Sequence, residues 1–129
     1  MRTILGIDLG TSSGKAMRLD AEQGVIAVRA EEYGVDIAHP GWAQQSPALW
    51  WESLVRVLRW LESHYREAYR SVCAVGYSGQ MHGMVLTDAK GQPVRPAVIW
   101  LDQRADRQLE EIGAVLSEED MGNVFCNRV

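Results

Sequence analysis

The most constraining feature of the sequence is a short apolar run, Thr3–Leu9, that leads directly into the small polar segment Gly10–Gly14. The run is rich in Ile and Leu, which predicts a buried central strand. The segment that follows it predicts a tight turn. Lys15–Asp20 and Val25–Tyr33 predict two further strands, separated by the turn residues Asp20–Gly24. Three strands joined by short turns predict an antiparallel meander.

Helix and strand patterns alternate after the meander. A loop is expected over Tyr33–Gln45, and then Ser46 and Pro47 predict a helix start, because Ser can cap free N–H groups and Pro is preset for the first helical position. Spacings of three and four predict that this helix packs on the sheet and runs to about Tyr69; its apolar stripe is Trp50, Leu54, Val57, Leu58, Leu61 and Tyr65. Another buried strand is expected over Ser71–Tyr77.

The last third of the sequence predicts a hairpin and a second helix. Met84–Thr87 and Pro96–Trp100 would form the hairpin arms around Asp88–Gln92. A helix is expected over Asp102–Val115, with an apolar side made of Leu109, Ile112 and Leu116. The pattern then fades, and the sequence ends on apolar residues without a partner, as expected of a cut domain: Val124, Phe125 and Val129. The order of elements predicts an α/β fold in one incomplete domain over residues 1–129.

Composition narrows the function classes. A net charge of −4, with acidic residues spread along the 129 residues, argues against a nucleic-acid partner, which needs a basic patch. No apolar run reaches the roughly 18 residues of a membrane span, and we expect neither a membrane partner nor a signal peptide. Cys73 and Cys126 stand alone in sequence, which favours reduced thiols in a cytoplasmic protein over a cysteine metal site.

The turn after the first strand has the residue types of a phosphate site. Gly10 lets the backbone come close to a ligand, and Thr11, Ser12 and Ser13 add hydroxyl groups beside their amides. Asp8 would place a carboxylate in the same space, where it could hold hydrated Mg²⁺. Residue types alone are equally compatible with an ordinary hairpin turn, since Asp and Gly are common there.

A Walker A loop is the other phosphate-binding candidate, because Gly10 and Gly14-Lys15 resemble its glycines and lysine. Two features argue against it. The spacing between the glycines is one residue short, and Ala16 stands where a Ser or Thr is required. A Walker A loop also opens a helix, whereas this sequence predicts a strand.

Four segments, in order and at matching spacing, resemble the FGGY carbohydrate kinases. Gly6–Ser12 is similar to the first phosphate motif of the actin-like ATPases, and most closely to that of this family. Gly41–Pro47 with Trp50-Trp51, Gly79–Gly83 and Pro96–Arg104 are similar to three further family segments. The resemblance implies the actin-like ATPase (ribonuclease H-like) fold, with this chain as the N-terminal part of the first domain. It also implies ATP and Mg²⁺ as cofactors, with Asp8 holding Mg²⁺ through water.

The resemblance implies a sugar-binding role for a second group of residues. Gln80-Met81-His82 is similar to the sugar-contacting motif of the family's D-xylulose kinases, and Trp100 to an aromatic wall of the sugar pocket. Asp102 and Arg104 are similar to a polar pair that shapes the cleft. Packing roles are the alternative for Met81, His82 and Trp100, and a capped helix start is the alternative for Asp102.

The expected whole enzyme transfers the γ-phosphate of ATP to a ketopentose, forming D-xylulose 5-phosphate from D-xylulose. The family's general-base aspartate and adenine-binding residues are expected beyond Val129, so we expect no kinase activity from this chain alone. Alternatives are a kinase for ribulose, fuculose, gluconate or glycerol, and a non-catalytic actin-like binding or assembly module. Apolar surface left open by the missing part of the domain predicts self-association.

Overall fold

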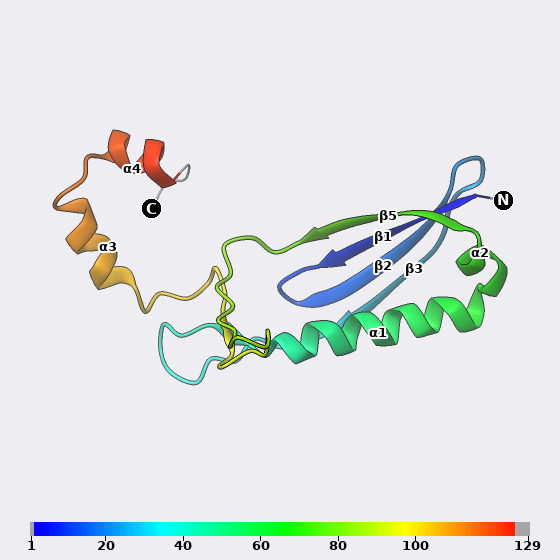
Figure 1. The fold of residues 1–129 in the computed structure, drawn as a ribbon, viewed down its shortest axis with the longest axis horizontal. Coiled ribbons are helices and arrows are strands. Elements are labelled where there is room, and N and C mark those ends of the chain that lie inside the picture. The colour runs from blue at the N-terminus through cyan, green and yellow to red at the C-terminus, as the bar shows by residue number, and fades with distance from the viewer. Residues whose placement is uncertain (1, 126–129) are drawn as a thin grey trace.

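The computed structural model describes residues 2–125, which form a four-stranded sheet, a short two-stranded ribbon and four helices (Figure 1). The strands of the main sheet lie in the order β3-β2-β1-β5. Their bounds are β1 Thr3–Leu9, β2 Ser13–Asp20, β3 Gly24–Glu32 and β5 Val72–Gly79. β1 pairs antiparallel with β2 and parallel with β5, and β2 pairs antiparallel with β3. The predicted meander and the α/β class are confirmed.

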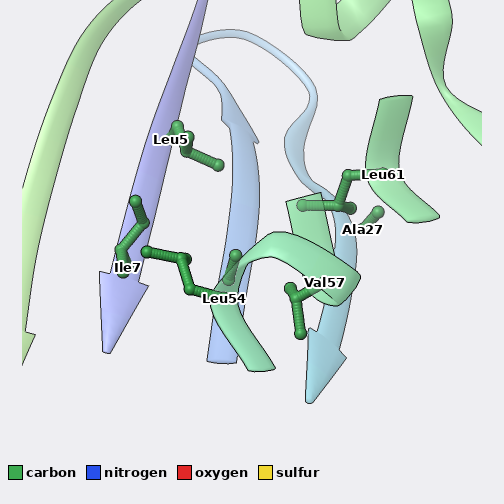
Figure 2. Close-up of a cluster of buried hydrophobic side chains, with 7 residues drawn as sticks. Leu5, Ile7, Ala27, Leu54, Val57 and Leu61 are labelled. Carbon is green, nitrogen blue, oxygen red and sulfur yellow. The ribbon is translucent and has the colours of Figure 1, made fainter. Parts of the chain in front are cut away.

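The hydrophobic core lies between the sheet and α1, Pro47–His64. Alternate residues of the strands point to the helix, and the predicted helix stripe supplies the other side of the core. Figure 2 shows six side chains of this buried cluster: Leu5, Ile7, Ala27, Leu54, Val57 and Leu61. Gly14 lets α1 approach β2 closely, because a Cβ at that position would lie 2.4 Å from Ser53 Oγ. At Gly14, the backbone of β2 therefore packs directly against α1.

The long helix begins where it was predicted to begin, but it lacks the expected capping hydrogen bond and ends earlier than predicted. Ser46 is the N-cap and Pro47 follows it, but the Ser46 side chain makes no capping hydrogen bond. The helix ends at His64, and a separate short helix, α2, spans Arg66–Arg70. Tyr65 leaves the helical region at φ −135°, directly after the side chains of Ser63 and His64 bond the carbonyl of Trp60. Such side-chain bonds compete with the helical ladder.

β5 is present as predicted, but it is not buried. Seven of its eight residues are exposed, and the Tyr77 side chain is 75% exposed. Within the described residues β5 is an edge strand with β1 on one side, and α1 covers β2 and β3. Whether a strand is buried depends on the helices and strands that pack against it. The apolar pattern of the strand's own sequence does not reveal these neighbours.

The predicted hairpin is only partly formed. Its arms are joined by isolated bridges between Met84 and Val98 and between Thr87 and Pro93. Pro93 and Pro96, on the returning side of the hairpin, have no N–H to donate to a regular ladder. β6, Ala97–Val98, instead pairs antiparallel with β4, Gln44–Gln45, inside the segment predicted to be a loop.

Two short helices end the described chain, α3 at Asp106–Gly113 and α4 at Glu118–Phe125. Figure 1 shows both of them apart from the main sheet and α1. The helix predicted over Asp102–Val115 starts four residues late, because Asp102 is held by contacts described below, and α4 was not predicted. No helix in the described residues is both long and apolar enough to cross a membrane. Cys126 and Val129 lie outside the described residues, as do the side chains of Val124 and Phe125.

Candidate functional site

A cleft of about 570 Å³ lies where β1 and β5 end. Because these strands are parallel, their C-terminal ends meet at the same edge of the sheet, and the segments that follow them face each other. The cleft is lined by Asp8, Gly10, Thr11, Gly79, Gln80, Met81, His82 and Trp100. Residues predicted for phosphate (Asp8, Gly10 and Thr11) and for sugar (Gln80–His82 and Trp100) therefore line one space of ligand size, whereas Ser12 and Ser13, also predicted for phosphate, do not line it.

The turn from Gly10 to Ser13 has each of its four carbonyl oxygens bound by a donor from the protein. The Tyr33 hydroxyl donates to Gly10 O at 2.6 Å, and the Tyr33 N–H donates to Ser12 O at 2.9 Å. Gln45 Nε2 donates to Thr11 O at 2.7 Å, and the Gly10 N–H donates to Ser13 O at 3.0 Å. The described hydrogen bonds engage neither the N–H of Thr11 nor that of Ser12. The turn thus has N–H groups available to a ligand, while its carbonyl oxygens are already bound within the protein. An anion requires this arrangement, because it accepts hydrogen bonds from N–H groups and is repelled by carbonyl oxygens.

Asp8 lies at the end of β1, opposite Lys15 of β2 and Ser78 of β5. Its Oδ2 would be 3.9 Å from a Cβ at Gly10, so the carboxylate reaches over the glycine of the turn. Burial, with a smaller contribution from the Asp8 charge, raises the pKa of Tyr33 above its ordinary value. The Tyr33 hydroxyl therefore keeps its proton and its bond to the turn at neutral pH.

Thr11 connects the turn to the sugar side. Its hydroxyl accepts a hydrogen bond from Trp100 Nε1 at 2.9 Å and donates one to Gln80 Oε1 at 3.3 Å. Because that proton is engaged by Gln80, we expect Thr11 to offer a phosphate its backbone N–H rather than its hydroxyl. Trp100 is 55% exposed and lines the cleft, so its side chain can serve as a wall of that space.

Gln45 is a residue of this site to which the sequence assigned no role. It is 1% exposed, and Nε2 donates to Thr11 O at 2.7 Å and to Gly34 O at 3.0 Å. Oε1 accepts from Trp50 Nε1 and from Gln80 Nε2, both at 3.0 Å. A single glutamine in an expected loop carries no pattern, so only its place in the Gly41–Pro47 segment could have drawn attention to it.

The Gln80–His82 segment is open to solvent at the cleft. Met81 is 72% exposed, and His82 has φ 59°, in the left-handed region that residues with a side chain seldom adopt. Gly79 precedes them at a close backbone approach, because a Cβ there would lie 3.1 Å from Leu9 O, which is a tight contact. An exposed methionine and a strained histidine at a cleft are unusual as packing residues and typical of a ligand-facing segment.

Asp102 and Arg104 lie outside the cleft lining and form a clamp behind it. Asp102 Oδ2 accepts from the Ala43 N–H at 2.7 Å and from Arg104 Nη2 at 2.7 Å. These bonds, first of all those from Arg104, lower the pKa of Asp102 to about 2. The Arg104 guanidinium lies over the Trp42 ring, 3.9 Å from its centroid. The pair therefore fastens the 102–104 segment to the start of β4, and a direct sugar contact from it stays a prediction.

The residues at the cleft fit a hydrated magnesium ion brought in with phosphates. Mg²⁺ keeps several waters and takes one or two carboxylates together with phosphate oxygens. Asp8 supplies one carboxylate at the cleft, and no group of three His, Cys, Asp or Glu side chains gathers anywhere in residues 2–125. This donor set is compatible with Mg²⁺ bound through its waters and the nucleotide.

The chain is similar to known carbohydrate kinases. Residues 3–124 match the FGGY family of carbohydrate kinases, N-terminal domain. The chain is 37% identical over 112 residues to the xylulose kinase of Lactococcus lactis, covering 87% of this chain and 22% of that protein. It is 35% identical over 112 residues to the glycerol kinase of Nitrosomonas eutropha, covering 86% and 22%. The structure of a xyloylose kinase from Brucella ovis superposes with a TM-score of 0.90 at 33% identity, covering 99% of this chain and 26% of that one.

The family match covers residues 3–124, which is nearly the whole chain. The actin-like ATPase fold is confirmed by the superposition on a sugar kinase. The chain spans about a fifth to a quarter of the length of the relatives that it matches. It belongs to the FGGY family of carbohydrate kinases, as a match to the family's N-terminal domain.

Proposed function

We propose that this chain forms the phosphate turn and part of the sugar wall of an ATP-dependent kinase for a ketopentose, with D-xylulose as the preferred substrate. One observation carries the proposal: residues of the donor-rich turn and of the Gln80–His82 segment line the same cleft. The proposal describes the longer protein of which this chain would be the N-terminal part of domain I. The chain alone is proposed to be inactive, since the general base and the adenine site are expected from the rest of that protein.

In the proposed reaction a sugar hydroxyl oxygen attacks the γ-phosphorus of ATP. The bond between the γ-phosphorus and the β,γ-bridging oxygen breaks, ADP leaves, and the hydroxyl proton passes to an aspartate outside this chain. The free N–H groups of Thr11 and Ser12 would bind phosphate oxygens, and Asp8 would hold hydrated Mg²⁺, which offsets the negative charge of the phosphates. Ser13 and Gly10 would shape the turn.

On the sugar side, Gln80 retains one amide hydrogen and one oxygen lone pair after its bonds to Gln45 and Thr11, and these can meet sugar hydroxyls. His82 can donate or accept according to its tautomer, and Met81 and Trp100 offer apolar surface to the sugar carbons. Asp102 and Arg104 would shape the cleft from behind. The similarity to a xylulose kinase favours a ketopentose, whereas the similarity to a glycerol kinase keeps a smaller polyol as the second candidate.

The test is a chimera in which this chain replaces the matching segment of the Lactococcus lactis xylulose kinase. ADP formation is measured with D-xylulose, D-ribulose and glycerol. We expect activity that is highest with D-xylulose, and no ADP formation from the 129-residue chain without the remainder. A chimera that prefers glycerol would overturn the substrate assignment, and activity from the chain alone would overturn its assignment as an incomplete site.

A further inference from the structure

The hydrogen bonds around Gln45 close into a ring. Thr11 Oγ1 donates to Gln80 Oε1, Gln80 Nε2 donates to Gln45 Oε1, and Gln45 Nε2 donates back to Thr11 O. The donor–acceptor distances around the ring are 3.3, 3.0 and 2.7 Å. The ring joins three segments that are far apart in the sequence: the turn after β1, the two-residue strand β4 and the segment after β5.

Gln45 fixes the direction of this ring. Both hydrogens of its Nε2 are engaged by carbonyls, of Thr11 and Gly34, and both lone pairs of Oε1 are engaged by N–H donors, of Trp50 and Gln80. Rotating the amide by 180° would place its oxygen against two carbonyls and its hydrogens against two donors. A buried, fully satisfied amide of this kind has one orientation and resists displacement.

We propose that Gln45 is a positioning residue that couples the phosphate turn to sugar-side Gln80, so that the two halves of the site move as one unit. The coupling matters for an in-line transfer. Thr11 lies on the side of the ring proposed to bind phosphate, and Gln80 lies on the side proposed to bind the sugar. The distance between the attacking sugar oxygen and the γ-phosphorus therefore depends on the ring, and the transfer rate depends on that distance. The catalytic part of the proposal rests on the kinase function proposed above. The structural coupling does not depend on that function.

The structural arm uses the 129-residue chain and its tryptophan indole N–H signals in ¹H–¹⁵N NMR spectra. Gln45→Met keeps the side-chain length and removes every bond of the amide. We expect the Trp100 signal to shift and to exchange with water faster, because Trp100 binds Thr11, whose carbonyl loses its donor. The matched control is Gln44→Met. Gln44 is also buried and neighbours Gln45, but it bonds Asp36 and Arg104, so the Trp100 signal should stay in place.

A second pair of variants applies if Gln45→Met does not give the spectrum of a folded chain. Thr11→Val removes the hydroxyl that joins Trp100 to Gln80, and Thr11→Ser keeps it. We expect the valine variant to shift the Gln80 side-chain amide signals together with the Trp100 indole, and the serine variant to restore both. A folded Gln45→Met chain with an unmoved Trp100 signal would overturn the coupling, and so would Thr11→Val with unmoved Gln80 signals.

The catalytic arm uses the chimera. We expect Gln45→Met to lower kcat about tenfold or more while the KM for D-xylulose changes less than about threefold, since small misplacements of reacting groups act on turnover. Gln44→Met should leave both constants near those of the parent. A raised KM with unchanged kcat would overturn the positioning role. If the parent chimera is inactive with every sugar, the proposed function is wrong. The NMR spectra of the 129-residue chain would still show whether Gln45 couples the phosphate turn to Gln80.

Discussion

The Asp102–Arg104 clamp predicts how the free energy of unfolding depends on pH. The Asp102 side chain is 3% exposed and accepts hydrogen bonds from Arg104 and from the Ala43 N–H. Its pKa falls from 3.8 to about 2 in the folded chain. A lowered carboxyl pKa stabilises the fold above the unfolded-state pKa, and this contribution is lost as the pH falls from about 4 to about 2. A shift of this size corresponds to about 2 kcal/mol at neutral pH.

Asp102→Asn removes that contribution at every pH. Urea unfolding followed by tryptophan fluorescence should therefore show a stability gap between wild type and Asp102→Asn that is about 2 kcal/mol larger at pH 7 than at pH 2. Trp42, which lies under Arg104, is a local reporter for the same transition. Asp106→Asn, at an exposed position at the start of α3, controls for the loss of one negative charge. Parallel pH dependence of the wild type and Asp102→Asn between pH 2 and 4 would refute the reasoning.

Three further predictions concern the turn, the helix contact and the sheet edge. In the chimera, Asp8→Ala should lower kcat by about 10²-fold or more with little change in the sugar KM, whereas Asp106→Ala should leave kcat intact; a change in the sugar KM alone would contradict the phosphate assignment. Gly14→Ala should lower the free energy of unfolding by about 1–3 kcal/mol, because the added methyl group would overlap the Ser53 side chain. In a double-mutant cycle measured by urea unfolding, Ser53→Ala in the Gly14→Ala background should recover part of this loss. The isolated chain should self-associate through the uncovered strand β5 in sedimentation velocity; a monodisperse monomer would count against this.

Local patterns were sufficient to predict much of the fold. Alternating and apolar runs located β1, β2 and β3, and the three–four spacing located α1, because these elements bury one face against the same core. The errors occur where distant segments decide the outcome. The strands β4 and β6 have two residues each, too few for a periodic signal, and they exist because they pair with each other. The burial of β5 depends on layers that its own residues do not encode.

The same division holds for the site. Asp8, Gly10, Thr11, Gln80, Met81, His82 and Trp100 were predicted from motifs, and all of them line one cleft. Tyr33 and Gln45 were missed, because their importance lies in which carbonyls they reach across the fold. Asp102 was predicted to shape the cleft together with Arg104, with a helix cap as the alternative; its carboxylate binds the Ala43 N–H and Arg104.

The four bound carbonyls of the Gly10–Ser13 turn have a consequence for the thermodynamics of the proposed phosphate binding. Because Tyr33, Gln45 and the turn's own backbone hold these oxygens without a ligand, the conformational entropy of the turn is lost during folding and not again on binding. A phosphate group would bind to a turn that already has its final conformation. Ordering of this turn would then contribute nothing to the heat capacity change of binding. If the proposed kinase function is correct, the turn would keep its conformation when substrates bind, and any reordering would take place in other segments.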